Sequence, residues 1–73
     1  MVIVNTVDVG RPYSVISLVS GEGGGSEDKA IQAMIQRAAN LGADAVVNVR
    51  ISYTAPSGIV KFFLAYGTAV KFT

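Results

Sequence analysis

The stretch SEDKAIQAMIQRAANLG, residues 26–42, decides the fold, because it carries the helical periodicity of this chain. Ser26 is a favourable N-cap residue, and Gly42 stands where a helix commonly ends in a left-handed residue. The apolar side chains between them recur every three or four residues and form one stripe: Ile31, Met34, Ile35, Ala38 and Leu41. The stretch predicts an amphipathic helix that ends at about residue 41.

The segments on either side of this helix have the period-two pattern of strands. Residues 13–20, 45–53 and 59–72 read as strands, with a turn at residues 54–58, and residues 2–9 form a β-rich arm that ends at Gly10-Arg11-Pro12. We therefore predict an α+β fold in a single domain, residues 1–73. It is a β-α-β-β two-layer unit, with one helix on a small antiparallel sheet and a short N-terminal β arm.

Strict alternation also predicts which side chains share a face of the sheet. In the first strand, one face is expected to carry Ile16 and Leu18, and the other face Tyr13, Val15 and Val19. In the second strand, one face is expected to carry Val47, Val49, Ile51 and Tyr53, and the other face Val46, Asn48, Arg50 and Ser52. The last strand is apolar on both faces, and Gly67 within it suggests a bulge or a close backbone approach. One helix covers one face, so the other face needs a partner that no remaining segment of the chain supplies.

The composition supports self-association and excludes several kinds of chemistry. The chain is 51% hydrophobic and only 15% charged, and it has no cysteine and no histidine. Domains of this size usually need disulfides, a metal or association to supplement their small core, and the absence of cysteine and histidine excludes disulfides and soft-ligand metal sites here. The lack of cysteine and histidine also excludes Ser-His-Asp, Cys-His and zinc-hydrolase chemistry. Of the three routes, association remains.

Charge and hydropathy exclude two classes of partner. The net charge is +1, and no two of the six basic residues are adjacent, so we expect no nucleic-acid binding. No apolar run approaches the roughly 20 residues of a membrane span, and the start of the chain lacks the features of a signal peptide. We expect no membrane partner and a cytoplasmic location.

A glycine-rich segment, GEGGGS at residues 21–26, joins the first strand to the helix. We interpret it as a flexible connection, since four glycines in five positions are unfavourable in a strand or a helix. The alternative is an anion site at the helix N-terminus that includes Gly21, but the lysine of a phosphate-binding P-loop is missing.

Five charged residues, one of them within this segment, are candidates for a site. Glu22, Glu27 and Asp28 could hold a hard cation, although acids at a helix start more often stabilise the helix dipole, and we predict no metal site. Asp44 is expected to accept hydrogen bonds from backbone N–H groups in the helix-to-strand turn. Arg50 could pair with an acid of an adjacent subunit or lie at a solvated rim.

The run LGADAVV at residues 41–47, with Tyr53 and with Gly67-Thr68-Ala69-Val70, closely resembles the YbjQ-like family, and Val19-Ser20-Gly21-Glu22 resembles the end of its first strand. The resemblance covers residues 6–71. It implies a heavy-metal-binding domain with the fold of a dodecin subunit and assembly as a ring-shaped homopentamer. Soft metals lack Cys and His ligands in this chain, and flavin lacks a tryptophan to stack on, so we expect no cofactor.

These observations together predict a non-enzymatic homo-oligomer that binds a small ligand or ion between subunits, with Gly21, Glu22, Asp44 and Arg50 as candidate ligand or interface residues. One alternative is an enzyme with an inter-subunit site built from Asp44, Arg50 and Glu22. Another is a purely structural or partner-binding ring.

Overall fold

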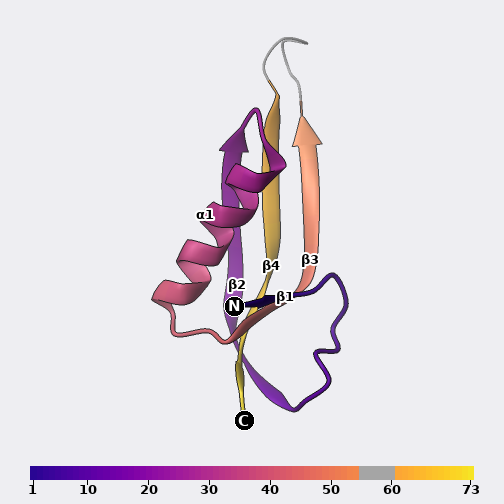
Figure 1. Cartoon of the computed structure of the whole chain (residues 1–73), viewed down its shortest axis with the longest axis vertical. Coiled ribbons are helices and arrows are strands. Elements are labelled where there is room, and N and C mark those ends of the chain that lie inside the picture. Colours follow the sequence, from indigo (N-terminus) through magenta and orange to yellow (C-terminus); the bar gives the residue numbers. More distant parts are fainter. Residues whose placement is uncertain (55–60) are drawn as a thin grey trace.

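The computed structural model describes residues 1–54 and 61–73 of the chain. One helix lies over a mixed sheet (Figure 1), and the elements in chain order are β1 Val2–Ile3, β2 Tyr13–Gly24, α1 Glu27–Asn40, β3 Ala45–Thr54 and β4 Phe62–Phe72. The predicted α+β class and the β-α-β-β order are confirmed. The predicted turn and the first residues of the last predicted strand lie outside the described residues.

The sheet has four strands in the order β1-β3-β4-β2. Strands β2 and β3 both pair antiparallel with β4, as predicted, but β1 pairs parallel with β3. The expected antiparallel sheet with a separate arm is therefore wrong in this respect. The arm joins the sheet because its backbone continues a ladder along β3: Val4 N–H donates to Val46 O at 3.1 Å, and Asn48 N–H donates to Thr6 O at 2.7 Å.

Helix α1 begins and ends close to where its local signals place it. Ser26 is the N-cap residue, with extended backbone and no side-chain capping bond, and Glu27 and Asp28 occupy the first turn. Gly42 has φ +78°, and the N–H of Ala43 donates to Ala38 O at 3.1 Å, which completes a Schellman C-cap. The predicted helix stop at Gly42 is confirmed.

The glycine-rich segment is the largest correction to the predicted fold. Residues 21–24, expected in a flexible loop, are the last four residues of β2, and Gly21 lies opposite Ala65 of β4. A Cβ on Gly21 would collide with the helix backbone, coming within 2.5 Å of Ala30 O, and a Cβ on Gly23 would come within 2.6 Å of Ser26 O. Alternate glycines therefore let α1 pack directly on the strand backbone.

The buried stripe of α1 is rotated from the predicted one for the same reason. Ala30, Met34 and Ala38 have no exposed surface, whereas Leu41, expected on the stripe, is 49% exposed. Small residues four positions apart allow the close approach to β2, with Met34 filling the remaining space. The core beneath the helix also contains Val19, Val46, Ala65 and Ala69.

Two bulges change the predicted faces of the strands. In β2 the pairing with β4 shifts at Ile16, so Val19 faces the helix while Val15 and Leu18 face away. In β3 it shifts at residues 48–49, where Asn48 has φ +54°. An extra residue reverses the alternation beyond it, and strict alternation therefore assigned both strands incorrectly.

The bulge in β3 lies opposite Gly67, where a close approach is confirmed. A Cβ on Gly67 would lie 2.7 Å from Val46 Cγ1 and 3.0 Å from Val47 O. Beyond the bulge, the face away from α1 carries Arg50 and Ser52, together with Val47 from before it.

Part of the face away from α1 is covered by the N-terminal arm, contrary to the expectation that no segment of the chain could reach it. Val4, Val9 and Tyr13 pack on a second small core of Ala45, Val47 and Val70. The arm folds back because Tyr13 Oη donates a 2.6 Å hydrogen bond to Val7 O. Beyond this cover, Leu18, Phe62 and Tyr66 on the same face are exposed in the part of the chain that the structure describes.

The described part of the chain contains no helix that is both long and apolar enough to cross a membrane.

Candidate functional site

The uncovered half of the face away from α1 carries large apolar side chains. Leu18 is 80% exposed, and Phe62 and Tyr66 are exposed as well. These residues share a face because Leu18 of β2 pairs with Thr68 of β4, and Thr68, Tyr66 and Phe62 are separated by even numbers of positions along β4. We call the surface formed by Leu18, Phe62, Leu64 and Tyr66 the open face.

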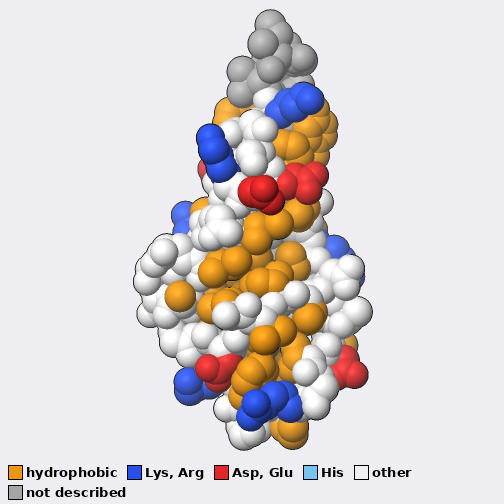
Figure 2. Space-filling model, in the orientation of Figure 1, with side chains coloured by type: hydrophobic (Ala, Val, Ile, Leu, Met, Phe, Trp, Pro, Cys, Tyr) orange, Lys and Arg blue, Asp and Glu red, His pale blue; other side chains and the backbone are white. Residues whose placement is uncertain are grey.

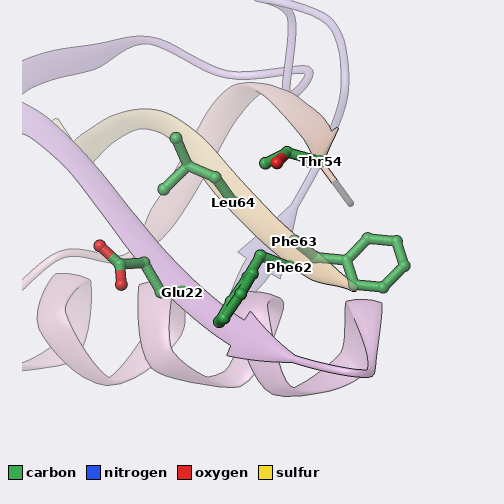
Figure 3. A pocket seen from close by; sticks show the side chains of 5 residues that line it. All are labelled: Glu22, Thr54, Phe62, Phe63 and Leu64. Carbon is green, nitrogen blue, oxygen red and sulfur yellow. The ribbon is translucent and has the colours of Figure 1, made fainter. Parts of the chain in front are cut away.

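The open face contains a shallow pocket of about 230 Å³ at the end of the sheet where β2 ends (Figure 3). It is lined by Glu22, Thr54, Phe62, Phe63 and Leu64. Cross-strand register brings the lining together: Glu22 lies opposite Leu64, and Thr54 lies opposite Phe62. A glycine, Gly24, lies opposite Phe62 on β2, so this position of β2 places no side chain beside the phenyl ring.

The helix side of the sheet is also incompletely covered. Helix α1 lies over β2 rather than β3 (Figure 1), and on β3 the side chains of Ile51 and Tyr53 remain 40% and 54% exposed. Figure 2 shows hydrophobic side chains in a band down the middle of the visible face. On the helix side of the sheet, Tyr53 packs against Phe63 with ring centroids 5.2 Å apart.

Two of the predicted site residues hold the fold together instead of lining the pocket. Asp44 Oδ2 accepts a 2.9 Å hydrogen bond from Phe72 N–H, and its second contact is Lys71 Nζ at 3.8 Å. The predicted backbone-binding role of Asp44 is confirmed in kind, although its donor lies on β4 rather than in the helix-to-strand turn. Arg50 Nη1 donates to Asn5 O at 2.7 Å and fastens the arm.

Asp44 and Arg50 are not brought together. Arg50 lies opposite Tyr66, while Asp44 binds the backbone of Phe72, six positions further along β4. At ~3.3 Å per residue this separates them by about 20 Å. A single site that used both residues of one subunit is therefore not formed.

The remaining candidates divide between packing and the pocket. Gly21 is buried against α1, where the lack of a side chain lets the helix pack on the strand backbone. Glu22, the next residue, lines the pocket. Glu27 and Asp28 lie in the first turn of α1. Within residues 1–54 and 61–73, no three acidic side chains converge as metal ligands would.

The pocket residues Thr54, Phe62 and Leu64 were not singled out as a site by sequence reasoning. The apolar alternation of the last strand marked Phe62 and Leu64 as surface in need of a partner. The signal that could have found the pocket is Gly24 placed opposite Phe62, but that pairing becomes visible only once the glycines are known to lie in a strand.

Comparison with known proteins agrees with this fold. A UPF0145 protein from Lactobacillus gasseri is 51% identical over 47 residues, which cover 64% of this chain and 44% of that protein. A UPF0145 protein from Thermosipho africanus is 52% identical over 46 residues, which cover 63% of this chain and 43% of that protein. The matched segments thus span less than half the length of these curated relatives.

A solved structure extends the likeness of fold to the whole chain. The crystal structure of a protein with unknown function from the DUF74 family of Pediococcus pentosaceus superimposes with a TM-score of 0.79 at 20% identity, covering 100% of this chain and 98% of that one. A family model described as "Putative heavy-metal-binding" matches residues 13–73. The chain therefore belongs to the YbjQ family.

Proposed function

We propose that this chain is a non-enzymatic subunit of a homo-oligomeric ring that binds a small ligand on the open face, between subunits. The observation that carries the proposal is the exposure of Leu18, Phe62 and Tyr66 on one face. Contiguous large apolar side chains on a surface mark an interaction site, because each costs free energy while it is in contact with water. A second copy of the chain is the occupant we propose.

The edges of the sheet support a head-to-tail arrangement. Among the described residues, β2 pairs on one side only, with β4, and the last part of β3, Ile51 to Thr54, likewise pairs only with β4. These two edges are at opposite sides of the sheet, so the edge of β2 in one subunit could pair with the edge of β3 in the next. Heterologous contacts of this kind form a ring when the rotation between successive subunits closes, and an open filament when it does not. The number five for the ring rests on the family resemblance.

The family description, heavy-metal binding, does not fit the donor atoms of this chain. Soft metals prefer thiolate and imidazole ligands, and the 73 residues contain neither cysteine nor histidine. Carboxylates could hold a harder cation, but the described residues bring no three of them together. We therefore do not base the proposed function on a metal.

The assembly is tested by sedimentation of the wild-type chain and two variants with the same charge change. The wild type is expected to sediment at a multiple of 7.6 kDa, and native mass spectrometry gives the number of subunits. Leu18→Glu should sediment as a monomer, because a carboxylate cannot be buried in an apolar interface without a partner. Gln36→Glu, on the exposed side of α1, should keep the wild-type mass.

Circular dichroism separates loss of assembly from loss of folding. Leu18 is mostly exposed in the single subunit, so Leu18→Glu should keep the helical signal. A wild-type chain that sediments at 7.6 kDa, or a Leu18→Glu variant with the wild-type mass, would contradict the proposal.

A further inference from the structure

The pocket of the open face presents one charge and otherwise apolar walls. Phe62 and Leu64 supply the walls, and the polar side chains are the Glu22 carboxylate and the Thr54 hydroxyl (Figure 3). No ion pair or hydrogen bond of the Glu22 side chain occurs with the residues that the structure describes. The pocket therefore offers hydrogen-bond acceptors and a negative charge that no described side chain neutralises.

The charge excludes one class of ligand and the size limits the others. An anion would be repelled by Glu22, and none of the described residues that line the pocket is cationic. A cavity of about 150 Å³ accommodates a benzene ring, so about 230 Å³ accommodates one ring with a short chain. A metal ion would find a single carboxylate here.

We infer that the pocket binds a small organic cation with an apolar body, such as an aryl-alkyl ammonium. The ammonium group pairs with Glu22, and the face of Phe62 adds a cation–π attraction. The apolar body packs on Phe62 and Leu64, in the space that Gly24 leaves open. This inference rests on the proposed function in taking the open face as the ligand-binding surface, and it names the chemical class of the ligand.

Three probes of equal size and different charge test the class of ligand. Benzylamine, benzyl alcohol and benzoate are titrated into the full isotope-labelled chain, and amide chemical shifts are followed by NMR. Benzylamine should bind best and benzoate worst, with the shifts centred on Glu22, Thr54 and Phe62. Equal affinity for benzylamine and benzoate, or no shift with millimolar benzylamine, would overturn the inference.

A matched pair of variants tests the role of Glu22. Glu22→Gln should weaken benzylamine about fivefold, the upper end expected for an exposed ion pair, and leave benzyl alcohol unchanged. Glu27→Gln, the same charge change in the first turn of α1, should leave both affinities unchanged. Equal loss of benzylamine affinity in both variants would show that net charge, rather than the pocket, attracts the amine.

Filling the pocket tests its location independently of charge. A Cβ on Gly24 would meet nothing within 4 Å, so Gly24→Leu should fold normally while its side chain occupies the space beside Phe62. All three probes should then lose binding. Unchanged benzylamine binding by a folded Gly24→Leu variant would place the amine elsewhere and overturn the inference.

Sedimentation of the same samples keeps this inference distinguishable from the proposed function. An oligomer that fails to prefer benzylamine contradicts the ligand class and leaves the proposed assembly standing. A monomer that prefers benzylamine contradicts the assembly and leaves the pocket standing.

Discussion

The two faces of the sheet are built on opposite principles. Under α1 the strands present glycine and alanine, with Gly21 and Ala65 side by side, so the helix backbone packs directly on the strand backbone. On the other face the strands present Leu18, Phe62 and Tyr66, which remain exposed. Small side chains let α1 come close and bury the part of the face beneath it within the subunit, whereas large exposed side chains leave apolar area for a further partner to bury.

Neighbouring glycines show the same contrast within one strand. Gly21 and Gly23 face the helix and have no room for a methyl group, whereas Gly24 faces away and has nothing within 4 Å of an added Cβ. Side chains at adjacent positions of a strand point to opposite faces of the sheet, so the neighbouring glycines Gly23 and Gly24 have different structural roles. Gly21 and Gly23 permit packing, and Gly24 leaves the pocket open.

The largest expected loss in the free energy of unfolding comes from truncating a buried side chain between α1 and the sheet. Met34→Ala should lower the free energy of unfolding by about 3–4 kcal/mol, because Met34 is fully buried and its loss leaves a cavity. Leu18→Ala, on the open face, is the matched change. Urea denaturation at several protein concentrations distinguishes the two variants.

For Met34→Ala the loss should be the same at every protein concentration, since the cavity lies within the subunit. For Leu18→Ala it should grow as the concentration rises, since Leu18 acts through the assembly. A Leu18→Ala loss that is independent of concentration would remove the contrast between the faces.

Next in size is the contrast between the two kinds of glycine. Gly21→Ala should cost about 2–3 kcal/mol, because the methyl group would have to displace the backbone at Ala30. Gly24→Ala should be neutral within about 0.5 kcal/mol or slightly stabilising, since alanine reduces the freedom of the unfolded chain. Both values come from thermal or urea unfolding, and equal losses would mean that α1 does not pack on Gly21 as the structure has it.

The smallest expected effect concerns the hydrogen bond between Asp44, in the turn that follows α1, and Phe72, at the end of β4. Asp44→Ala should lower the free energy of unfolding by about 1 kcal/mol, because Phe72 N–H loses its acceptor. Asp44→Asn keeps an acceptor oxygen and should lose much less. Urea denaturation of the two variants compares them, and equal losses would assign the effect to the charge contact with Lys71 instead.

Local signals predicted the parts of the fold that local contacts hold. The helix end at Gly42 depends on backbone hydrogen bonds between residues three to five positions apart, so the sequence nearby is sufficient to place it. The strand segments were recognised by alternation for the same reason. Faces were not predictable beyond Ile16 and Asn48, because a bulge arises from the pairing of two strands: Gly67 suggested a bulge in the last strand, but nothing local placed the extra residue in the strand that pairs with it.

The candidate site was predictable only in fragments. Glu22 was named among the candidates and does line the pocket, but the other two named with it bind backbone groups elsewhere: Asp44 accepts from Phe72 N–H, and Arg50 donates to Asn5 O. The sequence positions of Asp44 and Arg50 do not indicate whether each side chain is solvated or forms a hydrogen bond with a segment that is distant in sequence.

The sequence by itself determined the helix and its ends, the number of long strands, the exclusion of thiolate and imidazole chemistry, and the family. Only the tertiary structure decided that Gly21 and Gly23 belong to a strand, that the arm joins β3, and that Glu22 lies beside Phe62. The physical reason is the range of the interactions. Caps and periodicity act within one or two turns of the chain, whereas the approach of α1 to β2 and the register of β4 depend on residues that are far apart in sequence.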